Sequence, residues 1–290
     1  MPPKGSDPFF AKKGTDPPPP AGFWTEVVDR ADAALASGAM HSFECALEFA
    51  QDAGVEFVIR VATRYPQGEN AAGRTGAAPA LTRNPFAAPE PALVVRDRLT
   101  PTHRAILNKF SVLREHLLVV TRDDEDQREL LTERDFEALA ACMEDAEVLA
   151  FYNGGAEAGA SQSHKHLQVV TLPLSPRHSV PMDARLGGAE RLPFRHAFAR
   201  LAPGEATRPA GMLRAYTALR SEAGLEVPKP YNLLVTHEWM LVVPRSRDRC
   251  EGISINSLAF AGSFFVRDAR HAHAIVAAHP MSVLASVALP

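Results

Sequence analysis

The stretch Asn153-Gly-Gly-Ala-Glu-Ala-Gly-Ala-Ser-Gln-Ser-His-Lys-His-Leu-Gln168 joins a glycine-rich segment to two histidines and a glutamine at alternating positions. A short apolar run lies on either side of this stretch, and each run predicts a strand. Successive side chains of a strand point to opposite faces, so His164, His166 and Gln168 are expected to share one face. The stretch therefore predicts a loop between two strands that ends in a cluster of polar side chains.

The two histidines are candidates for nucleophilic chemistry. An unperturbed imidazole has a pKa of about 6.5 and is mostly neutral at cytoplasmic pH, so it can attack phosphorus and hold the transferred group covalently. A shared zinc ion is the alternative for two histidines at this spacing. No cysteine, aspartate or glutamate close by completes three protein ligands, so we expect no resident metal at the pair.

The glycine-rich segment is suited to binding an anion. Gly154, Gly155 and Gly159 permit positive φ, which lets successive backbone N–H groups face one phosphate, and Ser161 and Ser163 add hydroxyl donors. An ordinary connection between two strands would explain the glycines alone. The histidines that follow favour a phosphate-binding loop beside a nucleophile.

The bulk composition excludes several classes of protein. A net charge of −3 does not provide the basic surface that grips nucleic acid, so a bound anion must be held by local groups. The chain shows no signal-peptide pattern and no run of about 18 uncharged apolar residues, so we expect no membrane partner. Its three cysteines lie far apart, which predicts neither a disulfide framework nor a cysteine zinc site and favours a reducing cytoplasm.

The order of apolar and turn-forming residues predicts how the chain is organised. Residues 1–22 are rich in proline and predict a disordered lead-in, and residues 23–290 are expected to form a single domain. Helices are expected over 24–38 with Thr25 as the cap, over 43–53, 132–146 and 211–223, and at the C-terminus. Strands are expected over 55–62, 92–95, 107–121, 149–153, 167–172, 193–201, 231–236, 239–244 and 256–266, with a long connection over 65–91.

Two of the expected strands share a pattern. Glu115-His-Leu-Leu-Val-Val-Thr-Arg122 and Glu238-Trp-Met-Leu-Val-Val-Pro-Arg245 agree at Glu, Leu, both Val and Arg. A duplicated strand unit is one explanation, and two buried strands that draw on the same apolar residues are the other. The domain is therefore either one unit or two fused half-units.

The segment Phe151-Tyr-Asn-Gly-Gly-Ala-Glu-Ala-Gly-Ala-Ser-Gln-Ser-His-Lys-His-Leu-Gln168 resembles the active-site segment of the ATP adenylyltransferases, or diadenosine tetraphosphate phosphorylases. These enzymes belong to the galactose-1-phosphate uridylyltransferase-like branch of the histidine triad superfamily. The resemblance runs in order to the C-terminus and includes Asn84-Pro-Phe86, Leu107-Asn-Lys-Phe110, Glu115-His-Leu-Leu-Val-Val-Thr121, Tyr231-Asn-Leu-Leu234, Glu238-Trp-Met-Leu-Val-Val-Pro-Arg245 and Asn256-Ser-Leu-Ala-Phe-Ala-Gly262. It implies an α+β fold of the histidine triad type, with an antiparallel sheet flanked by helices.

The resemblance also implies roles for individual residues. His166 corresponds to the nucleophile that takes the adenylyl group, Gln168 to the residue that hydrogen-bonds the transferred phosphate, and His164 to a supporting residue. The substrate-binding residues that the family implies are Asn108, Lys109, Asn153, Gly159, Ala160, Ser161, Gln162, Gln168, Asn256, Ser257, Leu258, Ser263 and Arg267.

Three positions depart from the family's pattern. Arg267 stands where some relatives have lysine and keeps the cation, whereas Ser263 stands where some have methionine. A lysine that the family places after the first strand has no clear counterpart, and Arg64 is the nearest candidate.

Gln168 favours group transfer over hydrolysis. Histidine triad hydrolases generally have a third histidine at this position, which can shuttle a proton to a poor leaving group, whereas an amide does not titrate. A polyphosphate leaving group needs little protonation. We therefore expect reversible adenylyl transfer to His166 with ATP departing, followed by attack of inorganic phosphate to give ADP.

A tetraphosphate substrate requires local cations, and Lys109, Arg245 and Arg267 are the candidates, although Arg245 could instead end a strand at the surface. We expect no tightly bound cofactor, because Mg²⁺ or another divalent cation usually arrives on the phosphates of a nucleotide. Most of the following histidines are expected to be surface or packing residues: His41, His103, His116, His178, His196, His237, His271 and His273.

The sequence thus predicts a nucleotidyltransferase whose partners are a dinucleoside polyphosphate, ATP, ADP and inorganic phosphate. Two alternatives stay open: a sugar-1-phosphate uridylyltransferase, which shares the His-x-His-x-Gln arrangement, and a nucleotide-binding regulatory module without turnover. The segments 107–110 and 238–245 favour the adenylyl substrate, and the intact His164, His166 and Gln168 favour an enzyme.

Overall fold

The computed structural model describes residues 22–64, 84–113, 115–188, 191–227 and 229–290. The proline-rich lead-in over 1–22 lies outside the described residues except for Gly22, and the long connection over 65–91 is described only from Asn84 onward. The division into a lead-in and a single domain therefore stays a prediction.

The helices lie at the two ends of the chain and between groups of strands. They are α1 (Phe23–Ser37), α3 (Glu133–Met143), α4 (Pro209–Glu222), α5 (Ser257–Phe260), α6 (Ala269–Ala277) and α7 (Pro280–Val287). Short 3₁₀ turns are η2 (Pro91–Leu93), η3 (Ala156–Ala158), η4 (Pro181–Ala184) and η5 (Glu205–Thr207). No helix in the described ranges is both long enough and apolar enough to cross a membrane.

The strands form two main sheets and two short pairs. Their bounds are β1 (His41–Ser42), β2 (Glu44–Asp52), β3 (Val55–Arg64), β4 (Val94–Arg96), β5 (His103–Leu107), β6 (Phe110–Ser111), β7 (His116–Thr121), β8 (Val148–Gly154), β9 (His166–Thr171), β10 (Ala197–Arg200), β11 (Tyr231–Val235), β12 (Trp239–Pro244), β13 (Arg249–Cys250), β14 (Ile253–Ser254) and β15 (Ser263–Val266).

The large sheet has eight strands in the order β10-β12-β11-β8-β9-β7-β5-β4, and every neighbouring pair is antiparallel. The antiparallel α+β fold is therefore confirmed. β9 lies in the interior, where Gln168 is opposite Phe151 of β8 and Leu118 of β7. Because β9 is hydrogen-bonded on both sides, the directions of its side chains are fixed, and His166 and Gln168 point to the same face.

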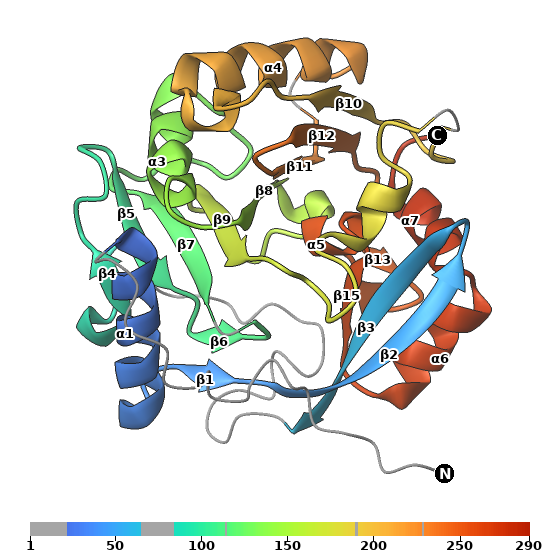
Figure 1. The fold of residues 1–290 in the computed structure, drawn as a ribbon, viewed down its shortest axis with the longest axis horizontal. Helices are drawn as coiled ribbons and strands as arrows, with labels where there is room; N and C mark the ends of the chain where they lie inside the picture. The colour runs from blue at the N-terminus through green and yellow to red at the C-terminus, as the bar shows by residue number, and fades with distance from the viewer. Residues whose placement is uncertain (1–21, 65–83, 114, 189–190, 228) are drawn as a thin grey trace.

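Helices cover the other face of the large sheet, which we call the back face and which carries Leu167 and Val169. These two side chains share one apolar cluster with Val27 of α1, Phe136 of α3 and Met212 of α4. Figure 1 shows α1, α3 and α4 bordering one side of the large sheet, with α6 and α7 beside β2 and β3 on the opposite side of the molecule. The back face is therefore an apolar helix-on-sheet interface.

The front face, which carries His166 and Gln168, is covered by two separate apolar groups. Over β8, β11 and β12 it packs against the three-stranded sheet β15-β3-β2 and against α5, α6 and α7. Over β5 and β7 it carries a small cluster of Phe86, Leu118 and Val120. The polar residues of β9 lie between these two groups, since their cross-strand neighbours belong to one or the other.

Residues 43–53, which the sequence predicted as a short helix, form a strand, and this prediction was wrong. β2 pairs antiparallel with β3 through a two-residue turn at Ala53 and Gly54, whose φ angles are 47° and 77°. Two successive residues with positive φ make the tight hairpin turn that matches the twist of the strands. Pairing with the buried strand β3 outweighs the local helix preference.

Several other boundaries differ from the predictions. The strand expected over 107–121 is divided into the end of β5, β6 and β7, and the strand expected over 193–201 covers only 197–200. The strand expected over 256–266 begins only at Ser263, because Asn256 Oδ1 accepts from the Leu258 N–H and caps α5. The strand expected over 92–95 begins at Val94, after a 3₁₀ turn. α1 begins with Gly22 as its N-cap in place of Thr25.

The remaining long elements are confirmed. The structure contains the strands expected over 55–62, 149–153 and 167–172 and the hairpin over 231–244. The helix predicted from residue 132 starts with the expected capping box, in which the Thr132 N–H donates to Asp135 Oδ2 at 2.7 Å.

A buried ion pair holds the back side of the segment that carries the histidines. Lys165 Nζ lies 2.9 Å from Asp135 Oδ2 on α3 and 3.0 Å from Glu125 Oε2. The Lys165 side chain is fully buried, so its charge is stabilised by these carboxylates and not by water. This pair joins the N-terminus of α3 to the residue between the two motif histidines.

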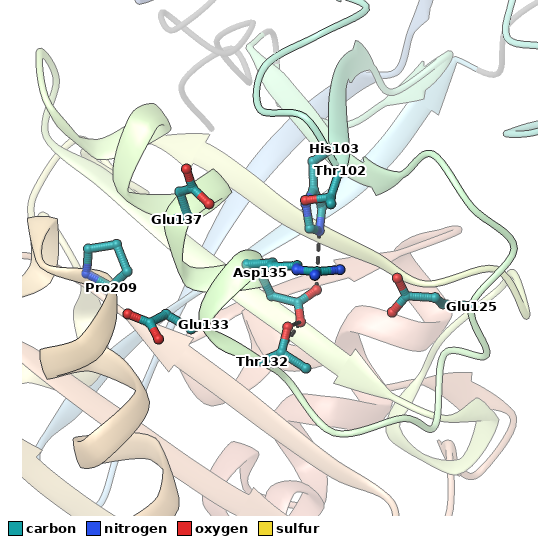
Figure 2. A pocket seen from close by; sticks show the side chains of 9 residues that line it. Thr102, His103, Glu125, Thr132, Glu133, Asp135, Glu137 and Pro209 are labelled. Atoms are coloured by element: carbon teal, nitrogen blue, oxygen red, sulfur yellow. Dashed lines mark hydrogen bonds and ion pairs between the residues drawn. The ribbon is translucent and has the colours of Figure 1, made fainter.

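Asp135 is the centre of this cluster. His103 Nε2 lies 3.2 Å from Asp135 Oδ1, and Figure 2 shows Asp135 between His103 and Thr132. Burial opposes the ionised form, but the hydrogen bond from His103 and the charge of Lys165 outweigh burial and lower the pKa of Asp135 to about 2. His103, expected as a surface or packing residue, is thus buried and hydrogen-bonded.

We expect Asp135→Ala to lower the free energy of unfolding by about 3–5 kcal/mol, because it leaves the ammonium of Lys165 buried without its partner on α3. A matched control is Asp268→Ala, since Asp268 also accepts from the first N–H groups of a helix but lies at the exposed start of α6. Its loss should be about 1 kcal/mol. Urea unfolding of both variants measures the difference, and equal losses would contradict the importance of the buried pair.

Candidate active site

His166 is the first residue of β9, and its side chain is buried. Its Nδ1 lies 2.8 Å from the carbonyl oxygen of His164. A carbonyl only accepts, so Nδ1 carries the proton and Nε2 keeps its lone pair. Burial lowers the pKa of His166 to about 4, although the bond to His164 opposes this effect. The ring is therefore neutral near pH 7, and its Nε2 carries an unprotonated lone pair.

His164 lies just before β9 and is held by both of its ring nitrogens. Nε2 is 2.8 Å from the carbonyl oxygen of Thr121, and Nδ1 is 2.7 Å from Nδ2 of Asn84. Phe86 packs against both motif histidines, with ring centroids 5.8 Å from His164 and 5.1 Å from His166. His164 is therefore held in a fixed position, with its carbonyl oxygen hydrogen-bonded to the ring of His166. Asn84 and Phe86 lie in a segment that carried the family resemblance.

Gln168 lies two residues after His166 on the same face, and its amide oxygen is 2.8 Å from Nε2 of His116 on β7. His116, one of the histidines expected mostly to be surface or packing residues, is buried and hydrogen-bonded to Gln168. Burial lowers the pKa of His116 to about 4, although the hydrogen bond to Gln168 opposes this effect. In the sequence, the signal for a buried polar role was the histidine at the start of the otherwise apolar run 116–120.

Asn153, at the end of β8, has an amide oxygen that accepts three hydrogen bonds. Asn232 Nδ2 lies 2.9 Å away, Ser257 Oγ 2.8 Å and the Ser257 N–H 3.0 Å. With its oxygen occupied in this way, Asn153 has its Nδ2 left as a donor. Ser257 thus acts on Asn153, and its hydroxyl also donates to the carbonyl of Tyr152.

Of the two placements considered for Arg245 from the sequence, the exposed end of a strand is wrong. Arg245 is 2 % exposed, so it is not at the surface, and its guanidinium donates to Asn232 Oδ1 and to the carbonyls of Ala158 and Ile255. Burial lowers the pKa of Arg245 to about 10, which still leaves it charged. Arg245 therefore organises the polar groups behind Asn153.

Gln127 joins His166 to the hydrogen bonds around Asn153, and it was not predicted from the sequence. Its Oε1 accepts from the His166 N–H at 2.8 Å, and its Nε2 donates to the carbonyls of Asn153 at 2.8 Å and His166 at 3.1 Å. These bonds satisfy backbone groups where β8 and β9 diverge. Gln127 lies in a polar loop without a recognisable pattern, so no signal in the sequence identified it.

The glycine loop turns at Gly155 and Gly159, whose φ angles are 101° and 93°. Gly154 is not in the positive region and is restricted by space, because a Cβ there would lie 2.8 Å from the Tyr231 ring. A Cβ on Gly159 would lie 2.9 Å from the carbonyl oxygen of Ile255 and 3.0 Å from Asn256. The loop and the start of α5 are therefore in close contact.

The other predicted loop residues follow Gly159. Ala160 and Gln162 are half-buried and Ser161 is exposed. Leu258, on α5, packs against the front-face core. These residues line the end of the loop without a hydrogen bond that ties them into the network around His166 within the described residues.

Four predicted residues belong to other interactions. Ser263 Oγ accepts from Arg60 Nη1 at 3.0 Å, Lys109 Nζ lies 2.6 Å from Glu90 Oε1, and the exposed Arg64 lies 3.4 Å from Glu44. Arg267 directly follows β15 and is half-buried. The structure therefore joins His164, His166, Asn153 and Ser257 in one hydrogen-bond network through Gln127. Asn108 and Gln168 belong to a second network through His116. Of the predicted cations, Arg245 lies in the first network through Asn232, whereas Lys109 is paired with Glu90.

A cavity of about 680 Å³ lies beside α3, away from this network. Thr102, His103, Glu125 and Asp135 contribute to its lining, and Figure 2 shows them with Glu133, Glu137 and Pro209. His103 belongs to the back side of the large sheet, as does Asp135 through Lys165. The cavity is therefore separate from the face that carries His166.

Comparison with known proteins gives consistent results. The model for the Ap4A phosphorylase N-terminal domain matches residues 14–187, and that for the ATP adenylyltransferase C-terminal domain matches residues 190–290. Diadenosine 5',5'''-P1,P4-tetraphosphate phosphorylase 2 of Saccharomyces cerevisiae is 30% identical over 224 residues, which cover 64% of this chain and 69% of that protein.

Two solved structures of a yeast protein extend the similarity to the whole fold. Yeast Ap4A phosphorylase Apa2 in complex with AMP aligns with a TM-score of 0.76, and its complex with Ap4A aligns with a TM-score of 0.74. In each case the identity is 25%, and the alignment covers 92% of this chain and 97% of the yeast chain.

We expect Gly159→Ala to destabilise the protein by more than the roughly 1–2 kcal/mol that a left-handed alanine costs, because its Cβ meets the backbone of residues 255–256. Gly204→Ala is the matched control, since Gly204 has a φ of 74° and a Cβ there would meet nothing within 4 Å. Thermal unfolding measures both losses. A loss at Gly159 no larger than at Gly204 would contradict the close contact between the loop and α5.

We expect the Cε1–H resonance of His166 to titrate with a midpoint near pH 4, in place of the roughly 6.5 of free histidine. Because the folded pKa is lowered, the unfolded chain binds the proton more readily, so stability falls as pH drops from about 6.5 to 4. NMR of histidine-labelled protein measures the midpoint, with the resonance assigned by its loss in His166→Gln. A midpoint near 6.5 would show that the ring is not neutralised by burial.

Proposed function

The chain belongs to the family of the Ap4A phosphorylases and ATP adenylyltransferases, and we infer from this that it is an enzyme that cleaves diadenosine tetraphosphate with inorganic phosphate to give ADP and ATP. Dinucleoside polyphosphates and nucleotides are therefore its substrates. The observation that carries the mechanism is the single tautomer of His166, whose Nδ1 is bound to the His164 carbonyl and whose Nε2 is unprotonated. The residue roles that follow are our proposal.

In the first step, we propose, Nε2 of His166 attacks the α-phosphorus of the dinucleotide. An N–P bond forms, the P–O bond to the remaining triphosphate breaks, and ATP leaves. The product on the enzyme is an adenylyl-His166 phosphoramidate, and the proton stays on Nδ1, where it is hydrogen-bonded to the His164 carbonyl. The neutral ring needs no general base, because Nε2 carries no proton at the start.

In the second step, inorganic phosphate attacks the adenylyl phosphorus from the side that ATP has left. An O–P bond forms, the N–P bond breaks, and ADP departs while His166 recovers its lone pair. Each step is a displacement between groups that leave readily, so the same geometry serves both directions. The reversible reaction expected from the sequence is retained in this proposal.

Gln168 supports transfer in preference to hydrolysis. An amide can donate a hydrogen bond to a non-bridging phosphate oxygen, but it cannot deliver a proton to a leaving group at neutral pH. Its oxygen is already occupied by His116, which leaves its nitrogen as the group available to substrate. The nearby amide of Asn153 has the same arrangement, with three donors on its oxygen.

Charge compensation is proposed to come from the nucleotide's own cation and from the positive groups nearest the network. Lys109 follows Asn108 directly, and its ion pair with Glu90 is partly exposed and can exchange for a phosphate. Within the described residues, no set of three or more His, Cys, Asp or Glu side chains is placed to hold a metal ion. We propose that Mg²⁺ or another divalent cation arrives on the substrate phosphates.

Cytoplasmic location remains a proposal. Cys45, Cys142 and Cys250 are free thiols, two of them buried, which suits a reducing compartment. The two alternatives from the sequence are outcomes of the assay below: a uridylyltransferase would need a sugar phosphate, and a regulatory module would bind without turnover.

The function is tested by incubating the protein with diadenosine tetraphosphate, with and without inorganic phosphate, and separating the products. Formation of ADP and ATP that requires phosphate supports the proposal. Two molecules of ADP formed without phosphate would identify a hydrolase, and turnover only with a uridine diphosphate sugar would identify a uridylyltransferase. Tight binding without products would indicate a regulatory module.

His166→Ala should abolish phosphorolysis, with a fall in kcat of at least about 10⁴-fold, and should prevent the acid-labile adenylyl label, because it removes the ring nitrogen that is proposed to form the bond to phosphorus. The control is His273→Ala on α6, an exposed histidine that should keep both the rate and the label. Label retained in His166→Ala would move the nucleophile to another residue.

A further inference from the structure

Three successive hydrogen bonds lead from the backbone N–H of Phe110 to Gln168, and the donor and acceptor of each can be assigned. The N–H of Phe110 is 3.2 Å from Asn108 Oδ1. A backbone N–H can only donate, so the oxygen of the Asn108 amide faces Phe110. The other end of that amide, Nδ2, is therefore the atom that lies 3.3 Å from Nδ1 of His116.

The direction continues through the ring of His116. An amide nitrogen donates and does not accept, so Nδ1 of His116 is the acceptor and carries no proton. The neutral ring then has its proton on Nε2, which lies 2.8 Å from Gln168 Oε1. We name these groups, from the Phe110 N–H through Asn108 and His116 to Gln168, the amide relay.

The strands hold the amide relay in place. His116 and Gln168 lie on neighbouring strands in diagonal positions of the same face, since Leu118 is opposite Gln168 and Val170 is opposite His116. The backbone N–H of Asn108 also donates to the His116 carbonyl at 2.9 Å. His116 packs against Phe151 with ring centroids 5.9 Å apart, which restricts rotation of its ring.

We propose that His116 is a positioning residue that sets the orientation of the Gln168 amide and so makes Gln168 a hydrogen-bond donor toward the transferred phosphate. Within the described part of the chain, Gln168 Nε2 has no protein acceptor, whereas its oxygen is held by His116. The inference rests on the proposed function for its substrate, but the orientation follows from the geometry of the free protein.

The orientation matters because the two ends of an amide act in opposite ways on an anion. A donor within about 3 Å of a phosphate oxygen stabilises the charge that develops during displacement, whereas an amide oxygen at the same place repels it. An unrestrained amide can rotate by half a turn and present either end. The amide relay removes the wrong orientation before substrate binds, and this lowers the cost of reaching the transition state.

The alternative is that His116 only fills space between β7 and β8. A packing role would make any loss of activity independent of Gln168, whereas a positioning role acts through Gln168 alone. A double-mutant cycle separates these two roles. The variants are His116→Phe, which keeps a ring of similar size without either nitrogen, Gln168→Ala and the pair combined.

We expect His116→Phe to lower kcat for phosphorolysis by about 10- to 100-fold, with KM changed much less, as for other residues that orient a group in a site. In the Gln168→Ala background the same change should cost less than about threefold. His116→Gln, which can still donate an N–H toward Gln168, should recover part of the rate. Equal losses from His116→Phe in both backgrounds would overturn the proposal.

A matched control is His103→Phe, which also removes a buried, hydrogen-bonded histidine but on the back face. It should lower stability while leaving kcat of the folded enzyme within about threefold, and its effect should be additive with Gln168→Ala. Circular dichroism and thermal unfolding give the folded fraction of each variant. A loss of kcat as large as that of His116→Phe would indicate a general effect of buried histidines and would contradict the relay.

A second measurement uses the wild-type protein and requires neither enzymatic activity nor a folded variant. The ¹⁵N shifts of the two ring nitrogens of His116 report which nitrogen carries the proton, and we expect Nε2–H at pH 7. A proton on Nδ1, or on both nitrogens, would overturn the amide relay. If the wild-type protein shows Nε2–H but no phosphorolysis, the proposed function fails while the amide relay stands. The double-mutant cycle is then measured with the Kd for diadenosine tetraphosphate in place of kcat.

Discussion

The hydrogen bond from Nδ1 of His166 to the carbonyl of His164 is the interaction on which the rest of the site depends. It is a contact between residues two apart in the chain, so it forms only if the backbone leading into β9 has one particular course. Thr121 and Asn84 hold the ring of His164, Gln127 holds the backbone of His166, and Lys165 holds the opposite side through Asp135. These partners come from separate parts of the chain, and together they fix a single tautomer of His166.

The site relies on neutral donors whose orientation is set in advance. The amide oxygens of Asn153 and Gln168 both accept from protein groups, so their nitrogens remain as donors. Arg245 is charged but buried, and it acts on Asn232 behind Asn153. A fixed dipole in a buried site requires little reorganisation as charge develops, which is why such groups can stabilise a transition state strongly.

The two faces of the large sheet differ in the side chains that they carry. The back face is an apolar interface with α1, α3 and α4, interrupted by the buried group of Lys165, Asp135 and His103. The front face has two apolar groups with the polar residues of β9 between them. The ion pair on the back face costs free energy to bury. It fixes Lys165, which lies between His164 and His166 in the chain.

The sequence by itself determined the motif, its strand and the chemistry that its residue types permit, because a period of two and a glycine turn are local properties that survive without knowledge of the partners. It also determined most of the interior strands, whose continuous apolar runs leave little choice. It was wrong where strand pairing or helix capping outweighs the local residue preference: residues 43–53 become a strand because they pair with β3 across the Ala53-Gly54 turn, and 257–260 become a helix because Asn256 caps it. Only the tertiary structure placed His116 on Gln168, Gln127 on His166 and Arg245 behind Asn153, since a hydrogen bond between residues separated by tens of positions depends on which strands are neighbours.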